Sequence, residues 1–425
     1  MTAPAYPDSV RYLYALGNEV RTAKLGLDRM RALARALGHP ERSFRSVHIA
    51  GTNGKGSTAA MIESCLRRWG ARTGLYTSPH LAEPTERIRI GGEQVRQAQF
   101  AAAFDQVHRA AERLLRDGLI DLHPTYFETV TAMAFVLFRE CGVQWAVLEV
   151  GLGGRLDATN IVHPELAVVT PVDLDHEAYL GSSIESIAGE KAGILKRGVP
   201  AVFAVQRPEA WRVLEQTAQS VQAPYYNAGD WACEDVRMEA CGSRFTLRRT
   251  RGFAIECPLA GEHQVANCAT AVAAVDLLGA PVEAVEDGIR NACWPGRLEY
   301  VGRNPDIILD GAHNPAGARA LARYLERFRA GRRIRLIYGA MRDKAVSEVA
   351  GILFPLADEV IATAPDQARA VRPEIIAQLA SHPQLRLAPN LPAALDLVRQ
   401  CPPEDLVVIT GSLYLVGEAR PLLLQ

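Results

Sequence analysis

Residues 47–58 read Val47-His48-Ile49-Ala50-Gly51-Thr52-Asn53-Gly54-Lys55-Gly56-Ser57-Thr58. The apolar run followed by a glycine-rich turn predicts a strand that leads through a loop into a helix. In such a loop, glycines let backbone N–H groups close around phosphate oxygens, Lys55 neutralises charge, and the Ser57 hydroxyl is able to ligate Mg²⁺. The spacing departs from the G-x-x-x-x-G-K-[ST] pattern, because Gly56 separates Lys55 from Ser57. We interpret the stretch as a nucleotide-phosphate site; a glycine-rich connection without a ligand is the alternative.

Outward from this loop, short apolar runs rich in β-branched residues alternate with longer helical patterns. The runs 145–150, 166–170 and 201–205 have the length of strands, and 58–69 and 129–140 have the pattern of helices. This alternation predicts an α/β fold with a mainly parallel sheet that carries helices on both faces. From Tyr225 to Pro258 the pattern changes to short alternating segments, which predict a small accessory antiparallel sheet.

The length of the chain and one breaker predict two domains. At 425 residues, the chain exceeds the size at which a single hydrophobic core usually keeps growing. The breaker Trp294-Pro295-Gly296 marks a boundary, and beyond it strand-like runs such as 307–309, 334–338 and 406–409 alternate with helical stretches. We therefore predict a P-loop nucleotide-binding domain over residues 1–295 and a smaller Rossmann-like α/β domain over residues 296–425.

Composition excludes several classes of protein. Lys and Arg number 47 against 48 Asp and Glu, so no global charge favours nucleic acid. Every hydrophobic run is interrupted before it reaches the length of a membrane-spanning helix. The eight cysteines form no C-x-x-C pair, and no secretory segment follows Met1. We expect a reduced protein of the cytoplasm.

Two further runs end in side chains suited to a metal. Glu149 lies near the end of the run 145–150, and His176 follows the run 166–170. Open α/β sheets bind ligands at the carboxyl ends of their strands, and carboxylate oxygen suits Mg²⁺. Both residues have structural alternatives: a cap or ion pair for Glu149, and a hydrogen bond for His176, because imidazole is a less usual Mg²⁺ ligand.

Lys191 is a third candidate, because it lies among apolar and small residues in the segment 187–195. Burial lowers the pKa of a lysine and would leave a neutral, reactive amine. An ion pair with Glu190 or another acid is the alternative.

Six ordered motifs carry a resemblance to a known family. They are His48-Ile49-Ala50-Gly51-Thr52-Asn53-Gly54-Lys55-Gly56-Ser57-Thr58, Thr77-Ser78-Pro79-His80-Leu81, the segment 151–160, Gly189-Glu190-Lys191-Ala192-Gly193, Asp310-Gly311-Ala312-His313-Asn314-Pro315 and Thr410-Gly411-Ser412-Leu413-Tyr414. With these motifs, nearly the whole chain resembles the folylpolyglutamate synthase and dihydrofolate synthase enzymes of the Mur ligase superfamily.

The resemblance implies an ATP-dependent carboxylate–amine ligase of folate biosynthesis and one-carbon metabolism. The acceptor carboxylate would attack the γ-phosphate of ATP, and the amine of L-glutamate would then displace phosphate. Such chemistry needs metal and cationic charge around the transferring phosphoryl group. The implied ligands of two Mg²⁺ ions are Ser57, Ser78, Glu149 and His176. Lys191 would be carbamylated by CO₂.

The resemblance also implies that ATP lies between the domains. The implied ATP-binding residues are Gly54, Lys55, Gly56, Ser57, Asn267, Arg297 and Asp310. His313 and Ser412 would hold the incoming glutamate, and the catalytic residues would be Lys55, Lys191 and His313. Taken singly, Asn267 has the alternative of a helix-surface amide, Arg297 of an interdomain salt bridge, and His313 of a turn-stabilising residue.

The acceptor site is implied by a third set of residues. The set comprises Gly26, Leu27, Asp28, Arg29, Thr125, Tyr126, Phe127, Glu128, Arg155, Leu156 and Asp157. The aromatic pair would stack on a flat pterin, although core packing at a helix start is the alternative for both rings.

Arg155-Leu156-Asp157 resembles the pattern of the bifunctional bacterial enzymes. We therefore predict both activities: dihydropteroate gains glutamate to give dihydrofolate, and reduced folates gain γ-linked glutamates. We expect a monomer whose partners are small molecules, with no nucleic acid and no membrane. The competing interpretations are a monofunctional folylpolyglutamate synthase, a peptidoglycan-precursor Mur ligase and a P-loop switch protein without ligase activity.

Overall fold

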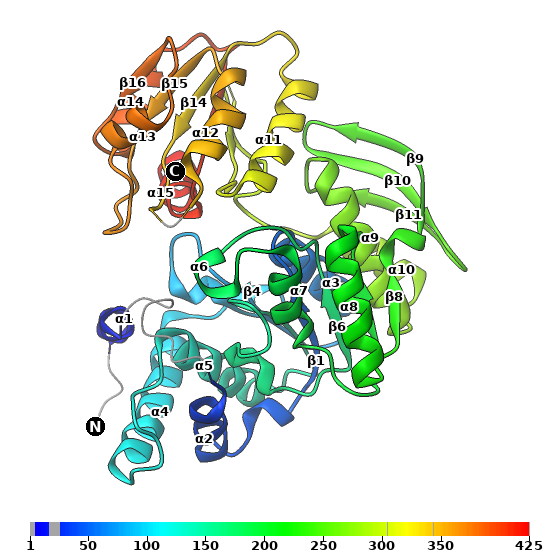
Figure 1. Cartoon of the computed structure of the whole chain (residues 1–425). Helices are drawn as coiled ribbons and strands as arrows, with labels where there is room; N and C mark the ends of the chain where they lie inside the picture. Colours follow the sequence, from blue (N-terminus) through cyan, green and yellow to red (C-terminus); the bar gives the residue numbers. More distant parts are fainter. Residues whose placement is uncertain (1–4, 17–25, 304, 343, 425) are drawn as a thin grey trace.

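The computed structural model describes residues 5–16, 26–303, 305–342 and 344–424. Its N-terminal part is built on an eight-stranded sheet (Figure 1). In spatial order the strands are β4 (Glu93–Gln94), β3 (Ile88–Ile90), β2 (Thr73–Tyr76), β5 (Trp145–Glu149), β1 (Arg45–Ala50), β6 (Leu166–Val169), β7 (Ala201–Phe203) and β8 (Tyr225–Asn227). The pairs from β2 to β8 are parallel, whereas β3 and β4 add antiparallel pairs at one edge. The prediction of a mainly parallel sheet is confirmed.

Helices cover both faces of this sheet, because its central strands are apolar on both sides. The helices are α1 (Tyr6–Ala15), α2 (Asp28–Ala36), α3 (Lys55–Arg68), α4 (Gln97–Arg116), α5 (Tyr126–Glu140), α6 (Glu177–Leu180), α7 (Ile184–Ala192), α8 (Pro208–Val221), α9 (Glu262–Leu277) and α10 (Val282–Arg290). In β5, Val147 packs in a core with α3, α9 and α10. Its neighbours Ala146 and Leu148 pack in a second core with α2, α4 and α5.

The predicted accessory antiparallel sheet is also confirmed. It consists of β9 (Ala232–Glu239), β10 (Gly242–Arg248) and β11 (Gly252–Cys257). Alternate residues of β10 and β11, among them Phe245, Leu247 and Phe253, pack in the same core as α9 and α10.

The C-terminal part is a second α/β domain with a six-stranded sheet. The strands, in spatial order, are β12 (Glu299–Gly302), β13 (Asp306–Leu309), β17 (Leu406–Thr410), β14 (Ile334–Tyr338), β15 (Glu359–Ala362) and β16 (Leu385–Leu387). All pairs are parallel except β12 with β13. The helices are α11 (Pro315–Phe328), α12 (Val346–Leu353), α13 (Pro373–Leu379), α14 (Leu391–Val398) and α15 (Leu413–Leu423). One core gathers α11, α12 and α13, and another gathers α14 and α15 on the opposite face.

The described residues also form short 3₁₀ turns: η1 (Pro40–Arg42), η2 (Pro84–Arg87), η3 (Ala158–Ile161), η4 (Ala228–Asp230) and η5 (Phe354–Leu356). In the described part of the chain, every helix is too short or too polar to cross a membrane.

Candidate active site

The glycine-rich loop follows the central strand β1 and opens helix α3 at Lys55, one turn earlier than the predicted helix 58–69. Gly54 caps the helix with a left-handed φ of 82°, a conformation that side chains other than glycine rarely adopt. A Cβ atom at Gly54 would lie 2.3 Å from Asn267 Oδ1, and one at Gly56 would lie 2.7 Å from the Trp294 ring. The loop therefore needs glycine at both positions, and its residues line a cavity at a helix N-terminus, where backbone N–H groups are able to bind phosphate.

Two amides of α9 fix the hydroxyl of Ser57. Gln264 donates from Nε2 to Ser57 Oγ over 3.2 Å, and Asn267 donates from Nδ2 to Gln264 Oε1 over 3.0 Å. Asn267 is buried, so the alternative of a helix-surface amide is wrong. Gln264 was not predicted from the sequence, because its role depends on the packing of α9 against α3.

Glu149 places a buried carboxylate beside this loop, at the end of β5. Its Oε2 accepts from the Ser78 N–H over 3.2 Å, and its Oε1 lies 4.0 Å from Lys55 Nζ. Burial raises the pKa of Glu149, and the charge of Lys55 counteracts that rise. Together, the oxygens of Ser57, Ser78 and Glu149 form the hard donor set that suits Mg²⁺. His176 lines the same cavity.

Lys191 lies in α7, and its side chain reaches the phosphate loop at Gly51. Its Nζ is buried and donates to the carbonyl oxygen of Gly51 over 2.8 Å. Burial, aided by the charge of Lys55, lowers the pKa of Lys191 to about 7. The alternative of a Lys191–Glu190 ion pair is wrong, because Glu190 Oε1 accepts instead from Arg155 Nη2 over 2.8 Å.

Arg297 and Asp310 line the opposite side of the same cavity. Asp310 Oδ2 accepts from the Leu298 N–H over 3.0 Å, and its Oδ1 accepts from the Ala312 N–H over 2.9 Å. Burial raises the pKa of Asp310 and lowers that of Arg297, and the attraction between the two side chains opposes both shifts. The cavity measures about 400 Å³ and joins the phosphate loop to the C-terminal domain.

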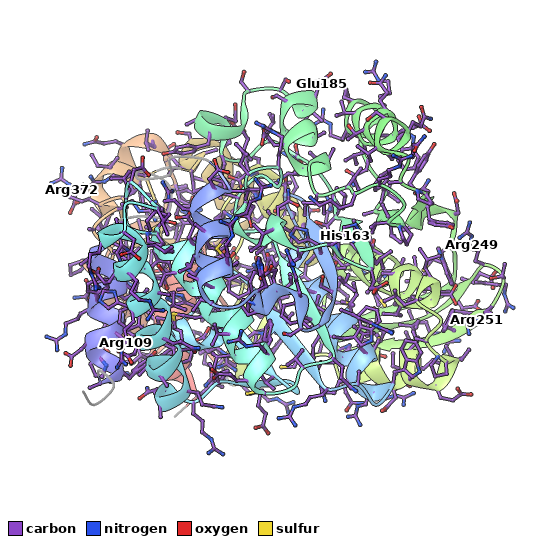
Figure 2. The ribbon with its side chains drawn as sticks, turned by 90° about the horizontal axis from the view of Figure 1, so that it is seen from below. Arg109, His163, Glu185, Arg249, Arg251 and Arg372 are labelled. Atoms are coloured by element: carbon purple, nitrogen blue, oxygen red, sulfur yellow. The ribbon has the colours of Figure 1, made fainter. Side chains whose placement is uncertain are left out.

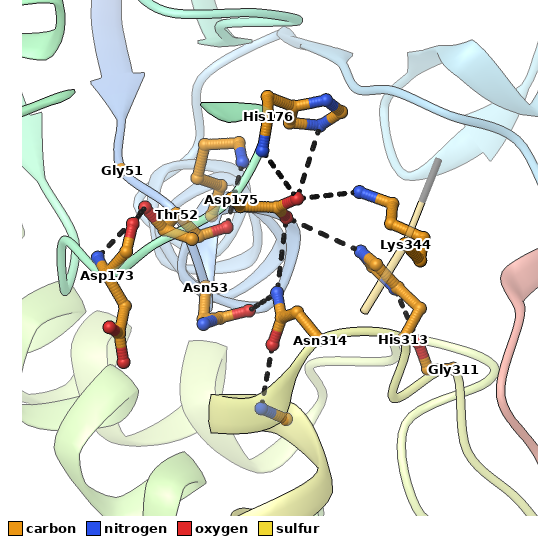
Figure 3. A network of polar contacts seen from close by, with 12 residues as sticks. Gly51, Thr52, Asn53, Asp173, Asp175, His176, Gly311, His313, Asn314 and Lys344 are labelled. Carbon is orange, nitrogen blue, oxygen red and sulfur yellow. Dashed lines mark hydrogen bonds and ion pairs between the residues drawn. The ribbon is translucent and has the colours of Figure 1, made fainter. Parts of the chain in front are cut away.

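Asp175, next to the predicted residue His176, connects the two domains (Figure 3). Lys344 Nζ donates to Asp175 Oδ1 over 2.7 Å, and Asn314 Nδ2 donates to Asp175 Oδ2 over 3.2 Å. Asn314 also donates to Oδ1 of Asn53 in the phosphate loop over 3.0 Å. Burial acts to raise the pKa of Asp175, but the attraction of Lys344, together with that of His176 and His313, outweighs burial and holds that pKa well below its usual range. The sequence did not predict this network.

A second cavity, of about 200 Å³, lies beside the first. Seven of the eleven predicted acceptor residues line it: Gly26, Arg29, Thr125, Phe127, Glu128, Leu156 and Asp157. His313 and Ser412 line it from the C-terminal domain, together with five residues that sequence reasoning missed: Met341, Lys344, Arg369, Leu413 and Tyr414. The two cavities share lining residues, among them Ser78, Pro79, His176 and His313.

Four predicted acceptor residues do not line this cavity. Tyr126 is buried in the core, stacked on Tyr14 and with Arg87 over its ring, as in the alternative of core packing. Leu27 is buried, the Asp28 side chain is 99 % exposed, and Arg155 is directed outward to Glu190. Neighbouring residues in the sequence thus differ in whether their side chains reach the cavity, the core or the surface.

Polar contacts hold the acceptor residues in place. Arg29 Nε donates to Glu128 Oε2 over 3.2 Å, and the same oxygen accepts from the Thr125 N–H over 2.8 Å at the start of α5. Asp157 Oδ2 accepts from the N–H groups of Gly151 and Leu152 over 3.0 and 2.9 Å. The buried carboxylate of Asp157 therefore shapes the loop that separates β5 from the cavity.

The predicted glutamate residues lie at helix or loop ends of the C-terminal domain. Ser412 caps α15, where its Oγ accepts from the Tyr414 N–H over 3.1 Å. His313 Nδ1 donates to the carbonyl oxygen of Gly311 over 2.8 Å, so the alternative of a turn-stabilising contact is present as well. Burial lowers the pKa of His313 to about 3, so the ring is neutral at pH 7 and Nε2 is an acceptor.

Two family descriptions match this chain. Residues 49–275 match the Mur ligase middle domain, and residues 296–413 match the Mur ligase glutamate ligase domain. The dihydrofolate synthase/folylpolyglutamate synthase of Bacillus subtilis strain 168 is 36% identical, with 98% of each chain covered.

Solved structures agree with these matches. Mycobacterium tuberculosis folylpolyglutamate synthase, complexed with ADP and AMPPCP, superposes with a TM-score of 0.92 at 34% identity, covering 99% of both chains. E. coli FolC in complex with DHPP and ADP superposes with a TM-score of 0.89 at 31% identity, covering 99% of this chain and 98% of the other. The chain thus belongs to the Mur ligase family of ATP-dependent ligases, among its dihydrofolate synthase/folylpolyglutamate synthase members.

Proposed function

We propose that this protein ligates L-glutamate to dihydropteroate, forming dihydrofolate, and to reduced folates, extending a γ-linked chain, with ATP as co-substrate. The observation that carries the proposal is the junction of the two cavities at Ser78, His176 and His313. A nucleotide on the phosphate loop and an acceptor in the second cavity would meet there. The ligands in the titles of the related structures, ADP with AMPPCP and DHPP with ADP, support this division.

The proposed reaction has two steps. An oxygen of the acceptor carboxylate attacks the γ-phosphorus of ATP. The bond between this phosphorus and the oxygen that stays on ADP breaks, and an acyl phosphate forms. The glutamate amine then attacks the acyl carbon, phosphate leaves, and the amine loses a proton. Lys55 and Arg297 offset charge on the transferring group, in a buried site where such charges act strongly.

We assign Mg²⁺ to the oxygens of Ser57, Ser78 and Glu149, with His176 as a further ligand, and we propose that two ions bind. When bound, the metal polarises phosphoryl oxygens and neutralises their charge. The chemistry of Glu149 supports this assignment. Burial raises the pKa of this carboxylate, and a cation beside it would stabilise the charged form. Lys191, carbamylated, would add a second carboxylate-like group behind the loop.

We assign the glutamate to His313 and Ser412. Ser412 lies at the N-terminus of α15, which favours a carboxylate, and neutral His313 offers Nε2 to the incoming amine. We assign the acceptor to the seven predicted residues that line the second cavity, with Phe127 as the ring that contacts the pterin. The domains 1–295 and 296–425, a cytoplasmic location and a monomeric state belong to the same proposal.

The test is release of phosphate from ATP with L-glutamate and Mg²⁺, with dihydropteroate or tetrahydrofolate as the sole acceptor. Glutamate-dependent release with both acceptors is the expected result. Release with tetrahydrofolate alone would support the monofunctional alternative, and release with neither would overturn the proposal. A reaction without glutamate is the control for simple ATP hydrolysis.

A further inference from the structure

Two imidazoles and a carboxylate form a cluster away from the active site. The cluster consists of His108 and Glu112 on α4 and His123 in the segment before α5. One ligand atom from each residue lies within 4.8 Å of the others. His108 and Glu112 are four positions apart, so they share one face of the helix. Among the described residues that line the two active-site cavities, none belongs to this cluster.

The ring of His123 is held in the orientation that a metal ligand needs. Its Nδ1 donates to the carbonyl oxygen of Pro124 over 2.9 Å, because a carbonyl only accepts. This contact leaves Nε2 as the acceptor nitrogen, and its lone pair accepts from the hydroxyl of Tyr12 over 3.4 Å and lies 3.7 Å from Glu112 Oε1. A backbone carbonyl on the far nitrogen is the usual partner that fixes the tautomer of a metal-binding histidine.

His108 supplies an independent observation. Its ring is stacked on Phe104 with centroids 5.5 Å apart, and it meets the edge of Tyr12 at 4.7 Å. Its Nδ1 is buried and has no hydrogen-bond partner within the part of the chain that the structure describes. Burial lowers the pKa of His108, which favours the neutral ring that metals bind. A buried polar atom without a partner costs free energy, and an ion bound at Nδ1 would remove that cost.

We propose that His108, Glu112 and His123 bind a divalent transition-metal ion of the zinc class. Two imidazole nitrogens and one carboxylate oxygen are a donor set that zinc accepts, with a fourth position for water. Tetrahedral ligands at zinc distances lie about 3.3 Å apart, and the 3.7 Å between His123 and Glu112 is already close to that. An ion at His123 Nε2 would replace the hydrogen bond from Tyr12, and the released hydroxyl would then be able to hydrogen-bond the water. The ion would join α4 to the segment that leads into α5, and through Tyr12 to α1.

The experiment uses the full chain, stripped with a chelator and titrated with Co²⁺ in excess Mg²⁺, so that oxygen-rich sites are filled. We expect one equivalent to give the visible absorption of four- or five-coordinate Co²⁺, and Zn²⁺ to displace it. Glu112→Gln and His123→Gln should each weaken Co²⁺ binding at least about 10-fold. Glu112 is 48 % exposed, so its variant keeps the core intact and protects the test from misfolding.

The matched control is His163→Gln, which removes an exposed histidine elsewhere. In Figure 2, His163 lies well apart from Arg109, the neighbour of His108 on α4. This control should bind Co²⁺ as the unaltered chain does. Co²⁺ binding that is the same in all four proteins, or no binding by the unaltered chain, would overturn the proposal. Neither readout depends on ligase activity.

Discussion

Lys191 links burial to chemistry at a single side chain. An amine with a pKa of about 7 is mostly neutral at about pH 8, and only the neutral amine adds CO₂. We expect a carbamate carbon signal in ¹³C NMR after labelling with bicarbonate, and this signal should fade as the pH drops below about 7, where the amine is protonated. Lys191→Met should lose the signal and lower kcat at least about 10²-fold.

Lys196→Met is the control, because Lys196 is also an amine whose pKa burial lowers, but it donates to Asn160 and lines neither cavity. It should keep both the signal and the activity. A carbamate signal that survives in Lys191→Met would place the modification elsewhere.

A variant of Asp157 tests whether this residue supports the loop or contacts the pterin directly. Both of its oxygens accept hydrogen bonds, from Gly151 and Leu152 on one side and from the Thr159 N–H over 3.0 Å on the other. An asparagine replaces one of these oxygens with a donor, so Asp157→Asn should lower the free energy of unfolding by about 1–3 kcal/mol. Activity with both acceptors should fall together, and urea denaturation with parallel assays measures both.

Asp28→Asn is the matched control, because that side chain is exposed and should change nothing. If Asp157→Asn kept its stability and lost only the dihydropteroate reaction, Asp157 would be a pterin ligand rather than a support for the loop.

Among the structural elements, the loop between β1 and α3 has the strictest sequence requirement. Gly54→Ala adds a Cβ 2.3 Å from Asn267 Oδ1 at a φ of 82°, so both the backbone and α9 must shift. We expect a loss of ATP affinity of at least about 10-fold by calorimetry, because the N–H groups around the phosphates move.

Gly70→Ala is a control with the same kind of backbone strain. Gly70 has a φ of 91°, and a Cβ there would have nothing within 4 Å. Its expected cost is about 1 kcal/mol of stability with ATP affinity unchanged. Equal ATP affinity in the Gly54 variant would contradict the assignment of this loop to phosphate.

In the whole molecule, the ion pair of Asp175 and Lys344 decides how the domains meet. Both side chains are largely buried, at 11 % and 12 % exposure, so Lys344→Met leaves an uncompensated charge in the contact between the domains. We expect a rise in the KM for glutamate and a loss of kcat/KM of at least about 10-fold, measured by phosphate release. The pKa of Asp175 is depressed, so the stability that the pair contributes is fully present above about pH 4, the ordinary range of an aspartate, and is lost as the pH falls from there toward the depressed pKa.

Arg319→Met is the matched control for this pair. Arg319 lies 3.6 Å from Asp173 across the same contact, but its side chain is 52 % exposed. Exposed pairs contribute about 0–1 kcal/mol, so this variant should keep its KM. If both variants changed the KM for glutamate equally, the Asp175–Lys344 pair would be no more important for the contact between the domains than an exposed pair.

The sequence determined by itself the alternation of strands and helices, the accessory antiparallel sheet and the phosphate loop, because each depends on neighbouring residues. It did not predict β12 or the edge strand β3, which are short and have too few residues for a clear period. Phe127 and Tyr126 are adjacent, yet one lines a cavity and the other the core, since successive residues of a helix point about 100° apart.

Only the tertiary structure decided which distant side chains meet. Asp175 and Lys344 are 169 positions apart, and Gln264 and Ser57 are 207 apart. Their local patterns are those of ordinary polar residues, and their roles arise when packing removes water and leaves each group only protein partners. The residues of the phosphate loop can therefore be recognised from the sequence, whereas the contacts that distant residues make around this loop arise only in the folded molecule.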